Sequence, residues 1–422
     1  MLTRRALLRL AAGTLTTSLR PRRSWANESA RIVVVGGGFA GAACAKYLRL
    51  LDKTLAVTLV TPQPQFTACP LSNSVVTGLR DLSTLRYSYQ MLQHRYGMRI
   101  LFAIATEVDP TVRHVRLHDG RTLAYDRLVL APGIELRLDA LEGYDKGASV
   151  VFPHAWEAGE QTLLLRRQLE AMADNGLVVI SVPDNPYRCP PGPYERASLI
   201  AYYLQRTKPR AKVVILDSKD NFTKKDLFVA AWKTLYPQTL EWISGSRGGR
   251  VVRVDMQTRT LYTEFDSYKP AVANVIPPQR AAALARRSGL DRGKGWCPVH
   301  ASTFESAVQP YVHVIGDAAL ANPMPKSAFA ANIQAKACAA AVVALLHGVP
   351  VMPPVLMNTC YSLVAPDYGI SIAAAYRAID DAIVTIPGSD GTSPLDAPVA
   401  TRRLEAEYAR SWYANITADT FT

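Results

Sequence analysis

The order of apolar and polar positions predicts strands and helices that alternate along the chain. Residues 32–35, Ile-Val-Val-Val, form a continuous apolar run, which is typical of a strand buried on both faces. A glycine turn and a helical pattern to residue 51 follow, and the apolar run 56–60 predicts a second strand. A strand, a tight turn, a helix and a further strand in this order indicate a nucleotide-binding opening.

Three glycines occupy the turn between the first strand and the helix. Gly36, Gly38 and Gly41 have the spacing G-x-G-x-x-G, which gives a tight turn, close approach of the backbone to a pyrophosphate, and close helix–strand packing. Free N–H groups at the helix start then bind the phosphates. A glycine turn that serves packing alone is the alternative. The acidic residue that would bind an adenosine ribose is replaced by Thr61, whose hydroxyl forms a weaker hydrogen bond than a carboxylate.

Two later segments complete a pattern known from flavoproteins with two dinucleotide-binding domains. Residues 125–133 (YDRLVLAPG) predict a strand that ends in a Pro-Gly turn, and residues 311–320 (YVHVIGDAAL) predict a strand that ends in Gly316 and Asp317. In all three segments, and in their order, the chain resembles proteins of the pyridine nucleotide-disulfide oxidoreductase type. This resemblance implies that FAD is bound and that the aspartate hydrogen-bonds its ribityl chain.

A second dinucleotide-like domain is predicted between these segments, but its nucleotide loop is missing. The apolar runs 176–181 and 212–217 predict two of its strands. Where a second G-x-G-x-x-G is expected, the chain has VPDNPYRCPPGPYERA, with the single glycine Gly192 and five prolines. Because proline has no N–H group, this turn lacks the donors that hold a pyrophosphate. We therefore expect that NAD(P)H is not a substrate.

The last third of the chain predicts a long helix followed by a separate domain. Residues 327–346 form an alanine-rich helix whose positive N-terminal end is expected to face the flavin. The predicted fold class is α/β, with two Rossmann-like dinucleotide-binding domains of the pyridine nucleotide-disulfide oxidoreductase type and a C-terminal α+β interface domain. The predicted boundaries are 1–26 for a signal peptide, 27–147 and 276–347 for the discontinuous FAD-binding domain, 148–275 for the second domain, and 348–422 for the C-terminal domain.

Composition and charge limit the classes of function. The chain of 422 residues is 49% hydrophobic and 20% charged, as is usual for globular proteins. Its net charge of +13 falls to +7 without the first 26 residues, which contain six arginines and no acidic residue. The remaining charges are scattered, so we expect no nucleic-acid partner. After these residues we find no run of about eighteen apolar residues, so no membrane span is expected.

The six cysteines favour neither a metal site nor a haem. No C-x-x-C pair is present, so zinc sites and Fe–S clusters are not expected, and no C-x-x-C-H motif is present for a covalent haem. Cys44 and Cys338 lie among alanines in helical patterns, and Cys297 follows Trp296. These three cysteines are expected in the core.

The first 26 residues have the features of an export signal. A basic start is joined to a short apolar stretch and to a small-x-small end, Ser24-Trp25-Ala26. The pair Arg4-Arg5 resembles the twin-arginine type, which exports folded, cofactor-loaded proteins to the periplasm. Three further arginines just before the end of this segment also favour the twin-arginine type. An ordinary secretory signal and a short basic anchor are the alternatives.

Several longer strings resemble the flavoprotein subunit of flavocytochrome c sulfide dehydrogenase, a periplasmic enzyme that oxidises sulfide. They include RCPPGPYERA, IPPQRAA, GWCPV, HVIGDA, NPMPKS and NTCYSLVAPDYGIS, and the similarity runs through the whole chain after the first 26 residues. These strings are much more specific than the glycine fingerprint. The resemblance therefore implies a function in addition to a fold.

The resemblance assigns roles to three cysteines and one acid. Cys69 matches the cysteine that bonds to the 8α-methyl group of FAD, whereas a small buried residue beside a noncovalent flavin is the alternative. Cys189 and Cys360 match a redox-active disulfide above the flavin ring, and a purely structural staple is the alternative. Glu195 matches an acid near that disulfide that moves protons. The prolines around Cys189 are expected to hold it in a fixed, mostly extended turn.

The resulting hypothesis is oxidation of sulfide to polysulfide or sulfur through the disulfide and FAD. Hydrosulfide attacks the disulfide, FAD accepts two electrons, and a separate cytochrome c subunit takes them, because this chain has no haem motif. The cytochrome is expected near the C-terminal segment, where Trp412 or Tyr413 lines the flavin edge or else packs in the core. A sulfide:quinone oxidoreductase and a non-catalytic flavoprotein that stimulates a periplasmic sulfur-oxidising system are the alternatives.

Overall fold

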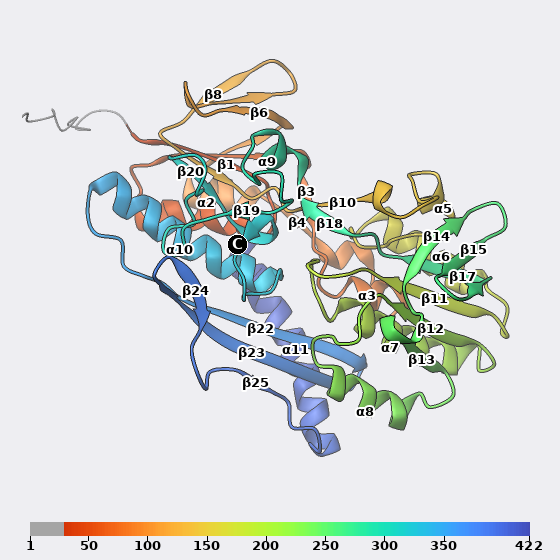
Figure 1. Cartoon of the computed structure of the whole chain (residues 1–422). Helices are drawn as coiled ribbons and strands as arrows, with labels where there is room; N and C mark the ends of the chain where they lie inside the picture. Colours follow the sequence, from red (N-terminus) through yellow and green to blue (C-terminus); the bar gives the residue numbers. More distant parts are fainter. Residues whose placement is uncertain (1–28) are drawn as a thin grey trace, which may run out of the picture.

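The computed structural model describes residues 29–422, which form three parts (Figure 1). The first part contains β1 and α2, the second contains β11 to β13, and the third contains the long strands β22 and β23 with α11. Parallel sheets with helices form the first two parts, so the predicted fold class is confirmed. The predicted signal peptide, residues 1–26, lies outside the described residues.

The first part is built on a five-stranded parallel sheet. Its strand order is β20-β9-β1-β2-β5, with bounds Val312–Val314, Arg127–Leu130, Arg31–Val35, Ala56–Thr61 and Arg99–Phe102. Four of the five β1 residues are buried, because helices and loops cover both faces of the sheet. The sheet therefore brings the ends of β1, β9 and β20 side by side, although they are far apart in sequence.

Smaller elements complete the first part. Its helices are α2 (Phe39–Leu51), α3 (Ser72–Val76), α4 (Gln90–Tyr96), α9 (Ala283–Arg287) and α10 (Ala328–His347). Its antiparallel strands are β3 (Gln65–Thr67) with β4 (Arg86–Ser88), and β6 (Ala105–Asp109) with β7 (His114–Leu117) and β8 (Thr122–Ala124). A short parallel pair joins β19 (Cys297–Pro298) to β21 (Ala319–Leu320), and two 3-10 turns span Leu82–Leu85 and Gly316–Ala318.

The second part repeats the parallel plan on a smaller scale. Its sheet order is β13-β12-β11-β17, with bounds Leu240–Ile243, Lys212–Asp217, Leu177–Val182 and Val272–Val275. Its helices are α5 (Ala148–Val151), α6 (Glu160–Ala171), α7 (Gly192–Thr207) and α8 (Lys225–Leu235). The antiparallel strands β14 (Val251–Asp255), β15 (Thr260–Thr263) and β16 (Ser267–Tyr268), with 3-10 turns Leu138–Ala140 and Gly245–Arg247, complete it. The pair β10 (Ile134–Leu136) and β18 (Gln279–Ala281) connects it to the first part.

The third part is an antiparallel sheet with one long helix. Strands β22 (Val355–Ala365) and β23 (Tyr368–Ile379) pair along most of their length, and β24 (Ala382–Thr385) and β25 (Gly391–Thr392) pair with β23. Helix α11 (Val399–Phe421) ends against the first part, where Phe421 stacks on Tyr87 at 5.0 Å and on Phe66 at 5.5 Å between ring centroids. These aromatic contacts hold the C-terminal end of the chain close to the first sheet.

Helix α10 lies along α2 in the core of the first part (Figure 1). Its residues are mostly small, and Cys44 of α2 and Cys338 of α10 are fully buried, as is Cys297, so the predicted core positions of these three cysteines are confirmed. Among the described helices, α10 is the one whose length and composition match a membrane span, although half of its most apolar window is buried inside the protein. We expected no membrane span from the sequence because we found no run of about eighteen apolar residues, and that search did not single out this helix. The absence of a span therefore stays a prediction.

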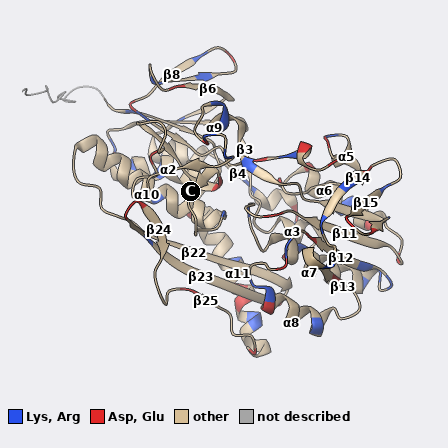
Figure 2. Cartoon of the chain, viewed as in Figure 1, with Lys and Arg blue, Asp and Glu red and all other residues tan. Residues whose placement is uncertain are grey.

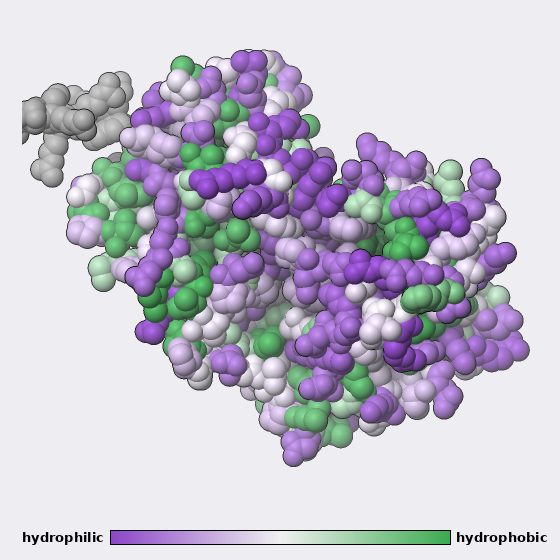
Figure 3. All heavy atoms as spheres, in the orientation of Figure 1, coloured by the Kyte–Doolittle hydropathy of each residue, from purple (hydrophilic) through white to green (hydrophobic). Residues whose placement is uncertain are grey.

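Positions of charged residues are interspersed over all three parts (Figure 2). Apolar side chains gather on one visible face over the outer end of α10 and the linker that leads to β22 (Figure 3). Val349, Met352, Val355 and Met357 are exposed in this region. We call these four residues the linker patch.

Candidate active site

A single cavity of about 540 Å³ collects the predicted site residues from all three parts of the protein. This volume is within the range of ligand pockets. The cavity is lined by nine of the ten predicted residues: Gly36, Gly38, Thr61, Cys69, Cys189, Glu195, Gly316, Asp317 and Cys360. The tenth, Gly41, lies behind the cavity wall in the first turn of α2. The structure thus brings together residues that are up to 324 positions apart.

The glycine turn has no room for side chains. A Cβ atom on Gly41 would lie 1.8 Å from the carbonyl oxygen of Gly36, and one on Gly36 would lie 2.2 Å from that of Ala131. Gly36 also has a φ of +107°, which L-residues rarely adopt. The backbone at the start of α2 therefore stays open to the cavity, as binding of a dinucleotide pyrophosphate requires.

Asp317 presents an unpartnered acceptor within the same wall. Its Oδ1 atom is buried and has no hydrogen-bond partner among the described residues. Burial raises the pKa of this carboxyl, although the charges of Arg188 and Lys326 oppose the shift. A buried acceptor without a donor is rare in folded proteins and suits a hydroxyl group of a bound ligand. Together with the glycine turn, it shows that these residues fit FAD.

The N-terminus of α10 opens on the cavity as predicted. Ser327 caps the helix, because its Oγ atom accepts a hydrogen bond from the backbone N–H of Ala330 at 3.0 Å. Ser327, Ala328 and Ala331 all line the cavity. The positive end of the helix dipole therefore faces the space in which a reduced, negatively charged flavin would be stabilised.

Thr61 is the last residue of β2 and occupies the position at which an acidic, ribose-binding residue is usual. It is buried, and its Oγ1 atom is 3.4 Å from the hydroxyl of Tyr89. That hydroxyl donates in turn to the carbonyl oxygen of Gly37 at 3.0 Å. The contact of Thr61 with a ribose stays a prediction.

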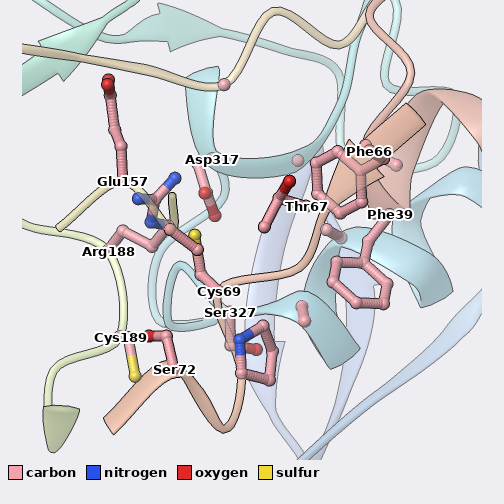
Figure 4. Close-up of a pocket in the computed structure, with 18 of the residues that line it drawn as sticks. Phe39, Phe66, Thr67, Cys69, Ser72, Glu157, Arg188, Cys189, Asp317 and Ser327 are labelled. Carbon is pink, nitrogen blue, oxygen red and sulfur yellow. The ribbon is translucent and has the colours of Figure 1, made fainter. Parts of the chain in front are cut away.

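Cys69 lies just before α3, and a guanidinium group lies close to it. Figure 4 shows the side chain of Arg188 between Glu157 and Asp317, next to Cys69. Burial alone lowers the pKa of Arg188, but its electrostatic interactions with Cys69 and Asp317 raise that pKa above its usual value. The Cys69 sulfur is 3.9 Å from the carbonyl oxygen of Trp156. This thiol faces the cavity beside a fixed positive charge.

Cys189 lies in a tight turn immediately before α7. Its φ is +57°, in the left-handed region that non-glycine residues seldom occupy, so the prediction of a mostly extended turn is wrong. The turn closes because the N–H of Gly192 donates to the Cys189 carbonyl at 2.8 Å, while the Cys189 N–H donates to the carbonyl of Lys326 at 2.8 Å. The strained backbone is thus held from both sides.

Cys360 reaches the cavity from the middle of β22. Both Cys189 and Cys360 are free thiols in the structure, which corresponds to the reduced form of the predicted pair, and the disulfide between them stays a prediction. Burial raises the pKa of each thiol, and a negative charge on Cys360 raises that of Cys189 further. Burial therefore favours the neutral thiol over the thiolate at both positions.

The carboxylate of Glu195 joins the elements around the two thiols by hydrogen bonds. Its Oε1 atom accepts a hydrogen bond from the backbone N–H of Leu363 at 2.8 Å, and its Oε2 atom accepts one from Nδ2 of Asn73 at 2.8 Å. Burial raises the pKa of Glu195 even though both hydrogen bonds favour the carboxylate. A carboxyl group with a raised pKa next to two thiols can exchange protons with them.

Several residues of this site were not predicted from the sequence. Arg196 is fully buried and binds the carbonyl oxygens of His154 and Ala155 and the side-chain oxygens of Asn73 and Asn274. Burial lowers its pKa to about 10. Nothing but its position after Glu195 distinguished it among the arginines of the chain.

A lysine next to Cys360 was also missed. Lys224 Nζ lies 3.9 Å from the Cys360 sulfur and 3.1 Å from its carbonyl oxygen. No local pattern separates it from the neighbouring Lys225, since the contact depends on how the residue before α8 meets β22.

The two aromatic candidates at the C-terminus differ. Trp412 lines the cavity, whereas Tyr413 is buried and its hydroxyl accepts a hydrogen bond from that of Tyr87 at 3.0 Å. Among residues 29–422, no group of three or more His, Cys, Asp or Glu side chains gathers as a metal site would require.

Comparison with protein families gives three matches along the chain. Residues 30–167 match "Pyridine nucleotide-disulphide oxidoreductase", residues 162–277 match "Sulfide dehydrogenase (flavocytochrome c) flavoprotein chain, central", and residues 352–421 match "Flavocytochrome c sulphide dehydrogenase, flavin-binding". The flavin cofactor predicted from the sequence is supported by these matches.

Individual relatives point in the same direction. The chain is 62% identical over 45 residues to the sulfide dehydrogenase (flavocytochrome c) flavoprotein chain of Chlorobaculum thiosulfatiphilum, covering 11% of this chain and 94% of that sequence. It is 29% identical over 184 residues to the sulfide-quinone reductase of Aquifex aeolicus, covering 43% of this chain but only 41% of the relative. The X-ray structure of the sulfide:quinone oxidoreductase from Aquifex aeolicus superposes with a TM-score of 0.75 at 18% identity, covering 93% and 92% of the two chains.

Proposed function

The chain belongs to the family of flavocytochrome c sulfide dehydrogenase flavoprotein chains, and we propose that it oxidises sulfide with FAD and passes the electrons to a cytochrome c subunit. One observation carries this proposal. Cys189 and Cys360 line the same cavity as the glycine turn and Asp317, so a thiol pair and a dinucleotide cradle share one space. Such a site suits transfer of electrons between sulfur and a flavin.

The reacting groups of the chain are the two cysteines and Glu195. In the oxidised state the two cysteines form a disulfide. Hydrosulfide attacks one of its sulfur atoms, which leaves a persulfide on one cysteine and a thiolate on the other. The carboxyl group of Glu195 holds or releases the proton that accompanies each change of thiol charge. A second hydrosulfide then removes the bound sulfur. FAD, when bound, accepts two electrons together and releases them one at a time, which a haem requires.

We also propose that Cys69 holds FAD by a thioether to its 8α-methyl group. The thiol faces the cavity beside the Arg188 side chain, so it is placed to reach a bound flavin. Gly36 and Gly38 would then hold the pyrophosphate, Gly41 would keep α2 close to the turn, Asp317 and Gly316 would face the ribityl chain, and Thr61 would contact the adenosine ribose.

The linker patch supports a docking site for the cytochrome. Met357 and Tyr361 lie four residues apart on β22, about 13 Å at the usual rise per strand residue, and Tyr361 lines the cavity. An exposed apolar patch at this distance from the flavin space suits a partner that receives electrons. Met352→Lys and Val355→Lys are expected to weaken capture of the cytochrome, whereas Phe265→Lys, at an exposed site in the second part, is not.

Export to the periplasm completes the proposal. The first 26 residues direct the folded, flavin-loaded protein through the twin-arginine route. Replacing Arg4 and Arg5 together by lysine is expected to move the flavoprotein from the periplasmic to the cytoplasmic fraction. Recovery of the double variant in the periplasm at the wild-type level would contradict this route.

Anaerobic addition of sulfide to the purified holoprotein with its cytochrome tests the function directly. We expect bleaching of the flavin absorption followed by the reduced haem spectrum. Reduction of decyl-quinone in detergent without cytochrome reduction would instead support a sulfide:quinone oxidoreductase, to which the fold similarity points. An unreactive flavin in the presence of bound cytochrome would support the non-catalytic, stimulatory role.

A further inference from the structure

Lys224 makes an unusual set of contacts with the strand that carries Cys360. Its side chain is buried, and its Nζ atom donates to Ser362 Oγ at 2.8 Å, to the carbonyl oxygen of Cys360 at 3.1 Å and to the Cys360 sulfur at 3.9 Å. An ammonium group has three donors, so all three are directed at Cys360 and its neighbour Ser362. The buried charge is therefore aimed at one of the two thiols.

The backbone of Lys224 is also held in a specific conformation. Its φ is +65°, in the left-handed region, and it occupies the N-cap position of α8 without a capping hydrogen bond from its side chain. A long side chain in this conformation is uncommon, and its burial removes a charge from water at considerable cost. The surrounding packing thus keeps a strained, buried cation beside Cys360, which is typical of a functional position.

Cys189 has no equivalent partner. In the described part of the chain, no cationic side chain donates a hydrogen bond to its sulfur, and the nearby Arg188 donates to the carbonyl oxygen of Trp156 instead. The other charged group that faces both thiols is Glu195, whose negative charge raises the pKa of each. The charge of Lys224 lowers both values and that of Arg188 also lowers the pKa of Cys189, but a hydrogen bond from a cationic side chain reaches the sulfur of Cys360 alone. The environment of the pair is asymmetric.

We propose that Lys224 sets the polarity of the thiol pair, so that Cys360 takes up the negative charge and hydrosulfide attacks Cys189. The inference rests on the proposed function and deepens it. In the step, a bond forms between the sulfide sulfur and the Cys189 sulfur, and the disulfide bond breaks. Its electron pair goes to Cys360, which leaves as a thiolate, while Cys189 keeps a persulfide. The charge is one negative unit on each side. A second hydrosulfide then takes the outer sulfur of the persulfide as HSS− and leaves Cys189 as a thiol. Oxidised flavin, with a c-type haem beyond it, accepts the two electrons that are released when the two cysteines form the disulfide again.

Limited alkylation of the reduced holoprotein tests the assignment without turnover. Iodoacetamide reacts with thiolates, so peptide mass spectrometry after a short exposure at neutral pH reports the charge on each cysteine. We expect Cys360 to be modified faster than Cys189 in the wild type. Lys224→Met is expected to slow modification of Cys360 about tenfold, which corresponds to a rise of one pKa unit. Lys224→Arg keeps the charge and is expected to retain most of the preference.

Lys225→Met is the matched control. This neighbouring lysine donates to the carbonyl oxygen of Asp220 on the surface and is outside the cavity wall. It is expected to leave both alkylation rates unchanged. Equal rates for Cys189 and Cys360 in the wild type, or an unchanged preference in Lys224→Met, would overturn the inference.

A second measurement uses the wild type only, so its result does not depend on whether the variants fold. After one equivalent of sulfide and rapid trapping with a thiol-blocking reagent, we expect the additional sulfur on the Cys189 peptide. Finding it on Cys360 would overturn the inference while the proposed function stands. If sulfide adds no sulfur and leaves the flavin oxidised, the proposed function fails, whereas the alkylation preference in the reduced protein still tests Lys224.

Discussion

The carboxylate of Glu195 accepts a hydrogen bond from the backbone N–H of Leu363 at 2.8 Å, and thereby joins α7 to the strand that carries Cys360. Its second oxygen accepts a hydrogen bond from Asn73 in α3. One side chain therefore bridges all three parts of the protein beside the two thiols. Its negative charge raises the pKa of Cys189 and Cys360, and its hydrogen bond to Leu363 holds the strand that carries Cys360.

Glu195→Gln separates the charge of this side chain from its shape. The glutamine oxygen keeps an acceptor for Leu363, but its amide group cannot accept from Asn73. Because the negative charge of Glu195 raises the pKa of Cys189 and Cys360, we expect both thiols of the reduced variant to react several-fold faster with iodoacetamide. Sulfide-dependent turnover is expected to fall, since the proton carrier is lost.

The control for this variant is Glu241→Gln, at an exposed position on β13. It is expected to change neither the alkylation rates nor turnover. Unchanged thiol reactivity in Glu195→Gln would show that the carboxylate charge does not act on the pair.

Gly41→Ala is expected to remove the flavin. The added Cβ would lie 1.8 Å from the carbonyl oxygen of Gly36, so α2 must move away from the turn that holds the pyrophosphate. We expect at least about tenfold lower flavin content in the purified protein, since a loss of 1.4 kcal/mol in binding already gives that factor. Gly391→Ala, where nothing lies within 4 Å of the new atom, serves as the control. Full flavin content in Gly41→Ala, measured by absorption at 450 nm, would contradict the proposed role of this turn in binding FAD.

These glycines show which features could be predicted from the sequence. The turn at Gly36 to Gly41 depends on local spacing and on the apolar strand before it, so its place at the cavity followed from a short stretch of residues. The helix predicted over residues 327–346 was equally clear from its alanine-rich pattern, and the structure places it at Ala328–His347. Both features are encoded within about twenty neighbouring residues.

Cys69→Ser tests the thioether. Acid denaturation of the wild type is expected to leave the flavin with the precipitated protein, whereas the variant releases it into the supernatant. Cys297→Ser, at a buried cysteine outside the cavity wall, is expected to behave like the wild type. Release of flavin from the wild type in acid would rule out the bond.

Asp317→Asn is best examined in the Cys69→Ser protein, where FAD can dissociate. The buried Oδ1 atom has no partner among the described residues, so the bound cofactor is expected to supply the donor. Loss of a hydrogen bond to a charged group costs about 1.5–3 kcal/mol, which predicts roughly 10- to 100-fold weaker FAD binding. Asp119→Asn, in an exposed pair with Arg121, is the control. Equal dissociation constants for the double variant and Cys69→Ser would contradict the role of Asp317.

Stability is expected to decrease as the pH falls through the range in which histidine titrates. Burial, with the charge of Arg196, lowers the pKa of His154 to about 4, and burial lowers that of His313 to about 4. Between the ordinary value near 6.5 and 4, the unfolded chain gains protons that the folded protein does not bind, so the free energy of unfolding falls. At about 1.4 kcal/mol per pKa unit, each histidine contributes about 3 kcal/mol.

His154→Asn isolates one of these contributions. The asparagine oxygen can replace Nδ1 as the acceptor for the backbone N–H of Trp156, which lies 3.1 Å from that atom. We expect a smaller loss of stability between pH 7 and pH 5 in urea unfolding than in the wild type. His94→Asn, at an exposed site, should retain the wild-type dependence. The same slope in His154→Asn and the wild type would contradict the assignment.

Other features of the site could not be predicted from local patterns. The left-handed turn of Cys189 depends on a hydrogen bond to the carbonyl oxygen of Lys326, which is 137 positions away in sequence. The contact of Lys224 with Cys360 depends on how the residue before α8 meets β22, and Lys225 has the same local sequence signal. The partners that tune the two thiols are tertiary contacts, so only the three-dimensional arrangement reveals them.

The central claim is that Cys189 and Cys360 carry the electrons of sulfide to the flavin, and sulfide-dependent haem reduction by Cys360→Ser tests it most directly. The purified variant, with its flavin and the bound cytochrome subunit, is mixed with sulfide under anaerobic conditions beside the wild type and the Cys297→Ser control. We predict a rate at least about 100-fold below that of the wild type, as expected when a reacting nucleophile is removed. Haem reduction at the wild-type rate in Cys360→Ser would contradict the account.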